Sequence, residues 1–97
     1  MMPEDQYHLK ARVSSYNLPG IRLALAATLP GASVRPEGTE LIVEAEVRGS
    51  TAKDLNRSLL SALRRVEKKT RIRSEWTSSN GSVERFFDYV LKGKRSP

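Results

Sequence analysis

Residues 50–76 constrain the fold of this chain more than any other segment. Thr51 and Asp54 form a capping-box pattern, in which a hydroxyl and a carboxylate satisfy backbone donors at a helix start. Apolar residues then recur at the spacing of one buried helical face: Leu55, Leu59, Ala62, Leu63 and Val66. No Gly or Pro interrupts the segment, so helix propensity agrees with the pattern. We expect one long amphipathic helix, with a break near Thr70 as the alternative.

The same segment carries most of the basic charge of the chain. Seven cations lie away from the apolar stripe, and on a continuous helix they form two neighbouring rows: Arg57, Arg64, Arg65, Lys68, Lys69, Arg71 and Arg73. Such rows neutralise backbone phosphates and release counterions, which gives affinity without sequence readout. We therefore predict that these residues contact nucleic-acid phosphate, together with Lys94 and Arg95 of the basic C-terminal tail.

The distribution of charge supports this prediction. The net charge is +6, and residues 51–97 hold twelve basic and five acidic side chains, whereas residues 1–50 hold five basic and six acidic ones. A basic half of this kind favours a polyanionic partner, nucleic acid first. The alternative is a solvated face that only keeps the chain soluble.

The rest of the chain indicates an α+β domain. Residues 7–13 alternate as a half-buried strand, and residues 17–29 form a short helix that Asn17 caps and Pro30-Gly31 ends. Residues 33–36 and 40–48 form a hairpin around Gly38. The order strand, helix, strand, strand, helix predicts an antiparallel-rich sheet with helices on one face. We expect a single domain over residues 1–97, with a core over 7–76 and a C-terminal extension over 77–97.

Two structures compete for the C-terminal extension. The apolar spacing of Val83, Phe86, Phe87, Val90 and Leu91 between Ser82 and Gly93 favours a helix. Asn80-Gly81 is a strong hairpin signal, which would instead pair residues 71–77 with residues 83–89 as strands. We favour the helix and retain the hairpin as the alternative.

Catalytic and ligand-binding motifs are absent from the sequence. There is no cysteine for a disulfide or a thiolate zinc site, no phosphate-binding glycine loop and no nucleophile elbow. His8, the only histidine, lies on the outward row of its strand, where we expect an exposed side chain without a carboxylate partner. We predict a protein that is not an enzyme and needs no cofactor or metal. Without a long apolar segment or a leader peptide, it should be soluble and cytoplasmic.

Some apolar residues are candidates for a protein interface. Leu23 and Leu60 widen the apolar stripes of the two helices, as expected where helices pack on a partner. Trp76, Phe86 and Phe87 are assigned to the same interface, with core packing or base stacking as alternatives.

The order of elements and several segments resemble a known family, the small Pcc-type (CTAG/Pcc) subunit of KEOPS. This complex helps to make threonylcarbamoyl-adenosine beside the tRNA anticodon. The resemblance covers residues 7–76 and includes the segments YHLKARV, ALAATLP and VRPEGTELIVEAE. In the helix that follows, Ser61, Leu63 and Arg64 match the family pattern, whereas Asn56 and Leu60 depart from it.

The resemblance implies a non-catalytic subunit that dimerises through its sheet and helices. It also implies docking onto the helical region of an ATPase-fold catalytic subunit, and help in holding tRNA. We therefore expect an accessory subunit of a KEOPS-like complex, as a homodimer or heterodimer. The alternatives are a free-standing nucleic-acid-binding protein of the ribosome or chromatin, and a purely structural dimer.

Overall fold

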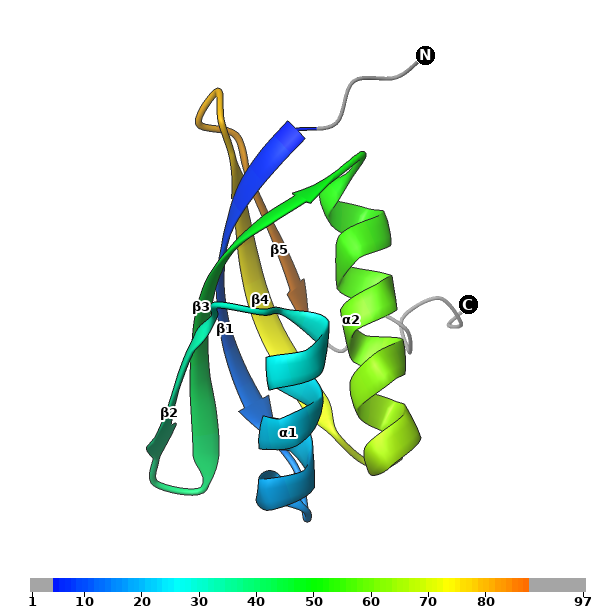
Figure 1. Ribbon diagram of the computed structural model, residues 1–97. Helices are drawn as coiled ribbons and strands as arrows, with labels where there is room; N and C mark the ends of the chain where they lie inside the picture. The colour runs from blue at the N-terminus through cyan, green and yellow to red at the C-terminus, as the bar shows by residue number, and fades with distance from the viewer. Residues whose placement is uncertain (1–4, 88–97) are drawn as a thin grey trace.

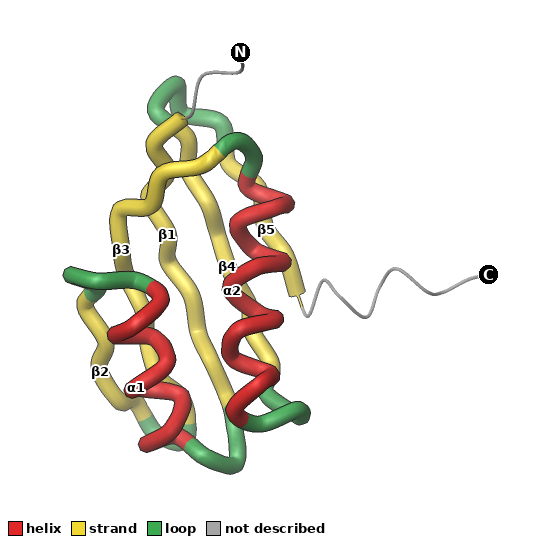
Figure 2. Tube along the Cα trace, turned by 45° about the vertical axis from the view of Figure 1, so that its right-hand side comes forward, coloured by secondary structure: helices red, strands yellow, loops and turns green. Residues whose placement is uncertain are grey.

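Five antiparallel strands form one sheet in the order β2-β3-β1-β4-β5, and two helices cover one of its faces (Figures 1 and 2). The structure, a computed structural model, describes residues 5–87. The elements follow the chain as β1 (Asp5–Ser14), α1 (Leu18–Thr28), β2 (Ser33–Glu37), β3 (Glu40–Gly49), α2 (Ala52–Val66), β4 (Arg71–Ser78) and β5 (Val83–Phe87). The expected α+β class, with an antiparallel sheet and helices on one face, is confirmed.

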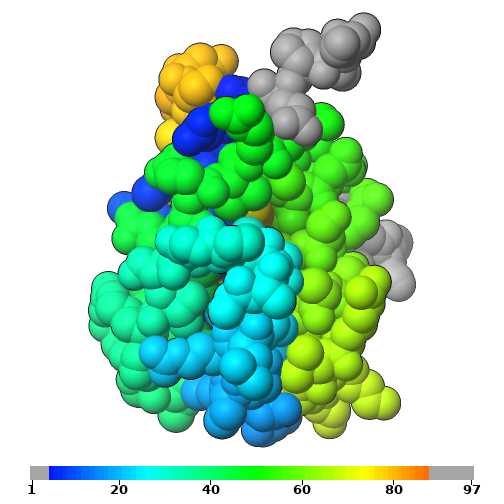
Figure 3. Space-filling view, in the orientation of Figure 1, coloured from blue at the N-terminus to red at the C-terminus, as the bar shows by residue number. Residues whose placement is uncertain are grey.

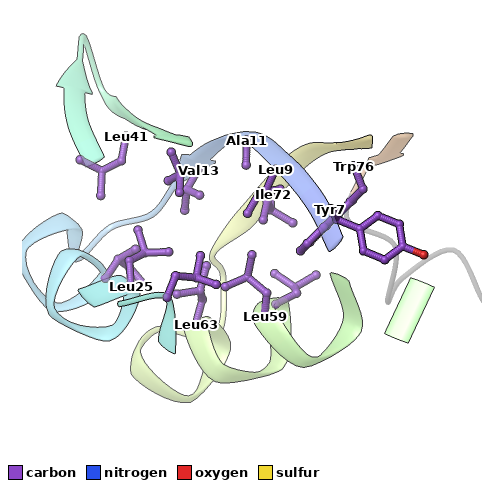
Figure 4. Close-up of a cluster of buried hydrophobic side chains, with 14 of the residues drawn as sticks. Tyr7, Leu9, Ala11, Val13, Leu25, Leu41, Leu59, Leu63, Ile72 and Trp76 are labelled. Carbon is purple, nitrogen blue, oxygen red and sulfur yellow. The ribbon is translucent and has the colours of Figure 1, made fainter. Parts of the chain in front are cut away.

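The core lies between the sheet and the helices and follows from the alternation of β1, the central strand. Tyr7, Leu9, Ala11 and Val13 all point toward the helices and are buried (Figure 4). Leu9 stands opposite Ala45 of β3 on one side and Trp76 of β4 on the other. Every second residue of β1 faces the other way, onto a surface that we call the open face of the sheet.

Local capping explains where the two helices begin. Asn17 Oδ1 accepts a hydrogen bond from Gly20 N at 3.1 Å before α1, and Thr51 Oγ1 accepts one from Asp54 N at 3.1 Å before α2. Each side chain satisfies a backbone donor that has no partner within its helix. Within residues 5–87, neither helix is long and apolar enough to cross a bilayer.

The expected helix over residues 50–76 is wrong beyond Val66, and the alternative of a break near Thr70 agrees with the structure. The Glu67 backbone N donates to Leu63 O at 3.2 Å as the last turn closes, and Thr70 N donates to Glu67 O at 3.0 Å in the turn that follows. Burial then alternates along β4, where Ile72, Ser74 and Trp76 face the core. Period-two burial suits a strand, and pairing with the free edge of β1 satisfies its backbone groups.

The favoured C-terminal helix is also wrong, and the hairpin alternative is confirmed. β5 pairs with β4, with Thr77 opposite Val83, across a turn in which Gly81 has φ of +91°. Glycine adopts this conformation without steric cost, which the Asn80-Gly81 signal predicts. Val90 and Leu91, on which the helix prediction partly rested, lie outside the described residues.

A polar contact joins α2 to β4 inside the core. Asn56 is fully buried, and its Oδ1 accepts hydrogen bonds from Ser74 Oγ at 2.5 Å and from Trp76 Nε1 at 3.1 Å. The Trp76 ring meets Tyr7 edge to face, with centroids 6.3 Å apart. These contacts hold the first half of α2 over β4. The chain therefore reverses direction at residues 67–70, between the end of α2 and the start of β4.

Candidate nucleic-acid interface

The basic residues predicted for one helix lie in three different settings. Arg57, Arg64 and Arg65 belong to α2, Lys68 and Lys69 to the turn after it, and Arg71 and Arg73 to β4. Exposed and buried side chains alternate along β4, so Arg71 and Arg73 point to the open face, on the other side of the sheet from α2. The predicted double row on one continuous helix is therefore wrong. Lys94 and Arg95 lie outside the described residues.

Arg64 is the one cation of this group that turns inward. It is half-buried, and its Nε donates to the backbone carbonyl of Thr70 at 2.9 Å. A guanidinium on this carbonyl satisfies a backbone acceptor at the point where the turn enters β4. Arg64 thus stabilises the turn, and its assignment to a phosphate-binding row is not supported by this geometry.

The remaining cations gather around the turn between α2 and β4. We call these five exposed side chains the basic corner: Arg65, Lys68, Lys69, Arg71 and Arg73. They extend from the end of the helix layer, around the turn, to the open face. Arg57 is exposed too, but it lies two turns nearer the start of α2. The corner therefore concentrates positive charge at one end of the molecule.

Glu67 lies within the basic corner and organises its backbone. Its Oε2 accepts a hydrogen bond from Lys69 N at 2.9 Å, while its Oε1 accepts from Ser15 Oγ at 3.1 Å and from Tyr16 N at 3.3 Å. These bonds favour the charged carboxylate, so the pKa of Glu67 is lowered, chiefly by the Lys69 N–H. The carboxylate therefore ties the loop after β1 to the turn before β4.

A hollow of about 900 Å³ opens beside this contact. We call it the loop-end hollow, because the loop after β1, the β2–β3 turn and the turn before β4 form its walls. Its lining includes Ser15, Tyr16, Thr39, Lys69 and Arg71. In Figure 3 the blue loop after β1 and the yellow-green turn after α2 meet at the lower edge of the molecule.

The open face carries further arginines, among them Arg12 and Arg35, besides Arg71 and Arg73 of the basic corner. One residue from each strand forms a row across this face, in the order of the strands in the sheet. Each residue of the row is the register partner of the next: Arg35, Ile42, Arg12, Arg73 and Phe87. Arg12 forms ion pairs with Glu37 at 3.2 Å and with Glu40 at 3.1 Å, and the Arg73 guanidinium lies 5.4 Å from the centre of the Phe87 ring. Two hollows, of about 400 and 310 Å³, flank this row and include carboxylates in their walls.

His8 does not match the prediction of a histidine without a carboxylate partner. Its Nε2 lies 2.9 Å from Glu44 Oε2 and its Nδ1 lies 2.5 Å from Glu46 Oε2, across the β1–β3 pairing. These hydrogen bonds, that of Glu46 first, raise the pKa of His8 above 6.5, and the same contact lowers the pKa of Glu46. The two carboxylates contact opposite nitrogens of the imidazole ring. Within residues 5–87, no cluster of His, Asp and Glu side chains is arranged to hold a metal ion.

The predicted protein-interface residues divide between core and surface. Leu60 and Trp76 are 0% and 1% exposed, so both belong to the core of this chain and their assignment to an interface is wrong. Phe86 is half-buried against the core, on the side of the helices. Leu23 and Phe87 are exposed, on α1 and on the open face respectively. The structure thus does not bring the five predicted residues together.

Sequence reasoning missed several residues of this region. Tyr16 and Glu67 act through a contact between two loops, which no local pattern reveals. Arg12 and Arg35 were detectable in part, because each lies on the outward row of a strand. Glu44 and Glu46 share the outward row of β3, and the register of β1 against β3, once known, places them beside His8.

In comparisons with known proteins, no family model, no curated protein and no solved structure matches the chain.

Proposed function

We propose that this protein is a non-catalytic, cytoplasmic, nucleic-acid-binding subunit, which contacts RNA phosphate through the basic corner. The observation that carries the proposal is the concentration of five exposed cations between residues 65 and 73. Glu67 is the single carboxylate between these positions, so the five cations outnumber the one negative charge. A phosphate backbone that approaches this end therefore meets a net positive surface.

The shape of the corner favours an irregular RNA over a straight duplex. The cations lie on a helix end, a turn and a strand, so they point in different directions and not along one groove. Folded RNA presents its phosphates in such irregular arrangements, and proteins recognise it largely by shape. No base-reading helix is needed for this mode of binding.

We further propose that the RNA is tRNA and that the protein acts within a KEOPS-like complex. Two features support this assembly. The first is the resemblance of residues 7–76 to the small Pcc-type subunit. The second is the order of elements from β1 to α2, which agrees with the layout that the resemblance implies. In this role the protein would dock, as a homodimer or heterodimer, on an ATPase-fold catalytic subunit.

The salt dependence of tRNA binding tests the basic corner. The double variant Arg65→Gln/Lys68→Gln removes two exposed cations and leaves Arg64 and Glu67 in place. We expect weaker binding and a slope of log K against log salt that is smaller by about 1.4 to 1.8, since each lost phosphate contact contributes roughly 0.7 to 0.9. An unchanged slope would exclude the corner as the binding surface.

A matched control separates the corner from total charge. The variant Arg48→Gln/Arg57→Gln removes the same charge from exposed positions far from the turn. We expect its salt slope to stay close to that of the wild type. Equal losses in the two double variants would indicate binding that depends only on net charge.

Co-purification from the native host tests the proposed assembly. Recovery of tRNA together with an ATPase-fold protein would support the KEOPS-like role. Recovery of ribosomal or chromosomal material without that partner would favour the free-standing alternative, and recovery of the chain alone, without nucleic acid, would favour the structural dimer.

A further inference from the structure

The row of side chains across the open face contains three arginines, two apolar residues and no carboxylate. We call it the cross-sheet row; in the order of the strands it consists of Arg35, Ile42, Arg12, Arg73 and Phe87. Neighbouring strands lie about 4.8 Å apart, so the row spans roughly 19 Å between the two edges of the sheet. The helices cover the opposite face (Figure 1), and no other described element lies over this one.

All five residues of the cross-sheet row line one hollow of about 400 Å³. Its lining contains five cations and two carboxylates, so the hollow is net positive even when the ion pairs among these groups are counted: Lys10, Arg12, Arg35, Arg73 and Arg85 against Glu44 and Glu75. A shallow surface of this charge favours an anionic ligand.

The carboxylates next to the row already bind other side chains. The pairs are Glu37 and Glu40 with Arg12, Glu44 with His8, and Glu75 with Arg85. Within residues 5–87, neither Arg35 nor Lys10 forms an ion pair, although Lys10 stands opposite Glu44 and Glu75 in the strand register. The two ends of the hollow that lie on β2 and β1 therefore keep positive charge for a ligand.

Arg12, at the centre of the row, contributes hydrogen-bond donors in a fixed position. Its charge is matched by Glu37 and Glu40, and both carboxylates contact Nη1. Among the described residues no acceptor contacts Nε or Nη2, so the donors of these two nitrogens remain for a ligand. The ion pairs hold the guanidinium in place before a ligand arrives, which lowers the entropy cost of binding.

Phe87 and Arg73 form a planar surface at the other end of the row. The Arg73 guanidinium lies 5.4 Å from the centre of the Phe87 ring, and 59% of Phe87 is exposed. Nucleic-acid bases stack on aromatic rings and on guanidinium planes. The half-buried Ile42 adds an apolar contact near the middle of the row. The row thus offers a stacking surface and phosphate-binding groups side by side.

We propose that the cross-sheet row binds a short single-stranded RNA segment, with a base stacked on Phe87 and phosphates contacted by Arg12 and Arg35. This inference rests on the proposed function and extends its RNA-binding surface from the basic corner onto the open face. The two surfaces are continuous, because Arg73 belongs to both. The length of the row suits two or three nucleotides, the number that open-sheet RNA-binding modules stack.

A single strand fits the open face better than a duplex. Within a duplex, the faces of the bases are covered by their neighbours, so a ring on a sheet surface cannot stack on them. An unpaired segment exposes its base faces and still carries its phosphates. Stacking of this kind tolerates all four bases, so we expect little sequence preference.

Affinity for two labelled RNA probes tests the stacking end of the row: a short single strand, and a blunt duplex that contains the same sequence. We expect Phe87→Ala to weaken single-strand binding roughly 5- to 100-fold, since base stacking on an aromatic side chain is worth this much. Duplex affinity should change less than twofold. Tyr16→Ala removes another exposed ring, away from the sheet, and should leave single-strand affinity near the wild-type value.

Two conservative variants separate stacking from a change in the fold. Phe87→Tyr keeps the aromatic ring and should bind the single strand as the wild type does, whereas Phe87→Leu keeps only an apolar side chain and should bind as weakly as Phe87→Ala. Equal affinities of Phe87→Tyr and Phe87→Leu would overturn the stacking role of Phe87.

Arg35→Gln tests the opposite end of the row, on β2. We expect weaker single-strand binding and a slope of log K against log salt that is smaller by about 0.7, the contribution of one phosphate contact. Arg48→Gln removes the same charge from an exposed position of β3 outside the row, and should change the slope far less. Equal changes in the two variants would show that net charge alone decides binding, which overturns the row.

The outcomes distinguish this surface from the basic corner. If Phe87→Ala and Arg35→Gln bind the single strand as the wild type does, while Arg65→Gln/Lys68→Gln still weakens tRNA binding, the row is excluded and the corner stands. If the two row variants lose affinity and Arg65→Gln/Lys68→Gln does not, the corner is excluded and the row stands. If the wild type binds neither probe nor tRNA at about 50 mM salt, both proposals fail.

Competition by a poly-glutamate peptide distinguishes RNA from an acidic protein segment. The peptide carries negative charge but no planar bases, so we expect it to displace the single strand far less effectively than an unlabelled strand of equal charge. Displacement as effective as that of the strand would overturn RNA as the ligand and assign the row to an acidic peptide.

Discussion

The Glu67 carboxylate accepts a hydrogen bond from the backbone N–H of Tyr16 at 3.3 Å, across 51 positions of the sequence. The other carboxylate oxygen accepts from Lys69 N, two residues along the chain from Glu67 itself. The Glu67 carboxylate, together with the hydrogen bond from Thr70 Oγ1 to Ser15 Oγ, thus holds the loop after β1 against the turn before β4. Tyr16 and Lys69 consequently line the same hollow.

We predict that Glu67→Gln removes an acid-sensitive part of the stability. The folded pKa of Glu67 is lowered below its usual 4.5, mainly by the Lys69 N–H, so the folded state binds fewer protons than the unfolded state. This contribution is fully present above about pH 4.5 and is lost as the pH falls through the folded pKa. Glutamine has a single acceptor oxygen, and its amide group cannot replace the other.

Urea unfolding of wild type and Glu67→Gln between about pH 6 and pH 3 measures this effect. The wild type should be more stable at the upper end, and the difference should shrink as the pH falls. Glu84→Gln, at an exposed position of β5, serves as the control and should show no such convergence. A constant difference between wild type and Glu67→Gln would contradict the prediction.

We predict that His8 titrates above its usual pKa of 6.5. A protonated imidazole donates from both nitrogens, and Glu46 and Glu44 accept on the two sides of the ring. Because the folded pKa is raised, the stabilisation is fully present below about pH 6.5 and is lost as the pH rises through the folded value.

As the only histidine of the chain, His8 gives unambiguous ring signals in a proton NMR titration. The midpoint should lie above 6.5 in the wild type and move down toward 6.5 in Glu44→Gln/Glu46→Gln. Glu37→Gln changes a carboxylate that pairs with Arg12 instead and should leave the midpoint nearly unchanged. Identical midpoints in wild type and the double variant would show that the carboxylates do not act on His8.

We predict that Asn56→Ala destabilises the fold by about 2–6 kcal/mol. The change leaves the Ser74 hydroxyl and the Trp76 indole N–H buried without the oxygen that accepts from both. Each buried donor without a partner costs about 1–3 kcal/mol. Chemical denaturation measures the loss, and Ser58→Ala, at an exposed position of the same helix, should change stability by less than about 0.5 kcal/mol.

We predict opposite behaviour for the two leucines that widen the apolar stripes of the helices. Leu60 is fully buried, so Leu60→Ala should cost about 2–5 kcal/mol through lost burial and a cavity. Leu23 is 75% exposed, and Leu23→Ala should change the free energy of unfolding by less than about 0.5 kcal/mol. Similar losses at the two positions, in the same denaturation assay, would contradict the assignment of Leu60 to the core.

The elements that could be predicted from the sequence are those whose signals are local. Alternation along β1 and β3, and the caps Asn17 and Thr51, depend on residues within a few positions of one another. The apolar spacing of α2 was also informative, although the buried face includes Leu60 and the polar Asn56 and leaves Val66 partly exposed. A helix can rotate by a fraction of a turn on its support, and only packing decides that rotation.

The two incorrect helices have a common cause. In residues 71–78 and 83–87 the spacing of apolar residues fits a helix as well as a strand. Within either segment alone, the helical period of 3.6 residues and the strand period of 2 are not distinguished. The free edge of β1 offers backbone partners to β4, whose other edge then offers them to β5. This gain depends on strands from distant parts of the chain, so no window of the sequence contains it.

The candidate site shows the same division. The sequence by itself determined that residues 65–73 are rich in cations and that few carboxylates oppose them. Tertiary structure decided where these cations point: Arg64 inward to Thr70, Arg71 and Arg73 onto the open face, and Lys69 beside Tyr16. The physical reason is that charge is a property of composition, whereas direction depends on backbone period and on long-range hydrogen bonds such as those of Glu67.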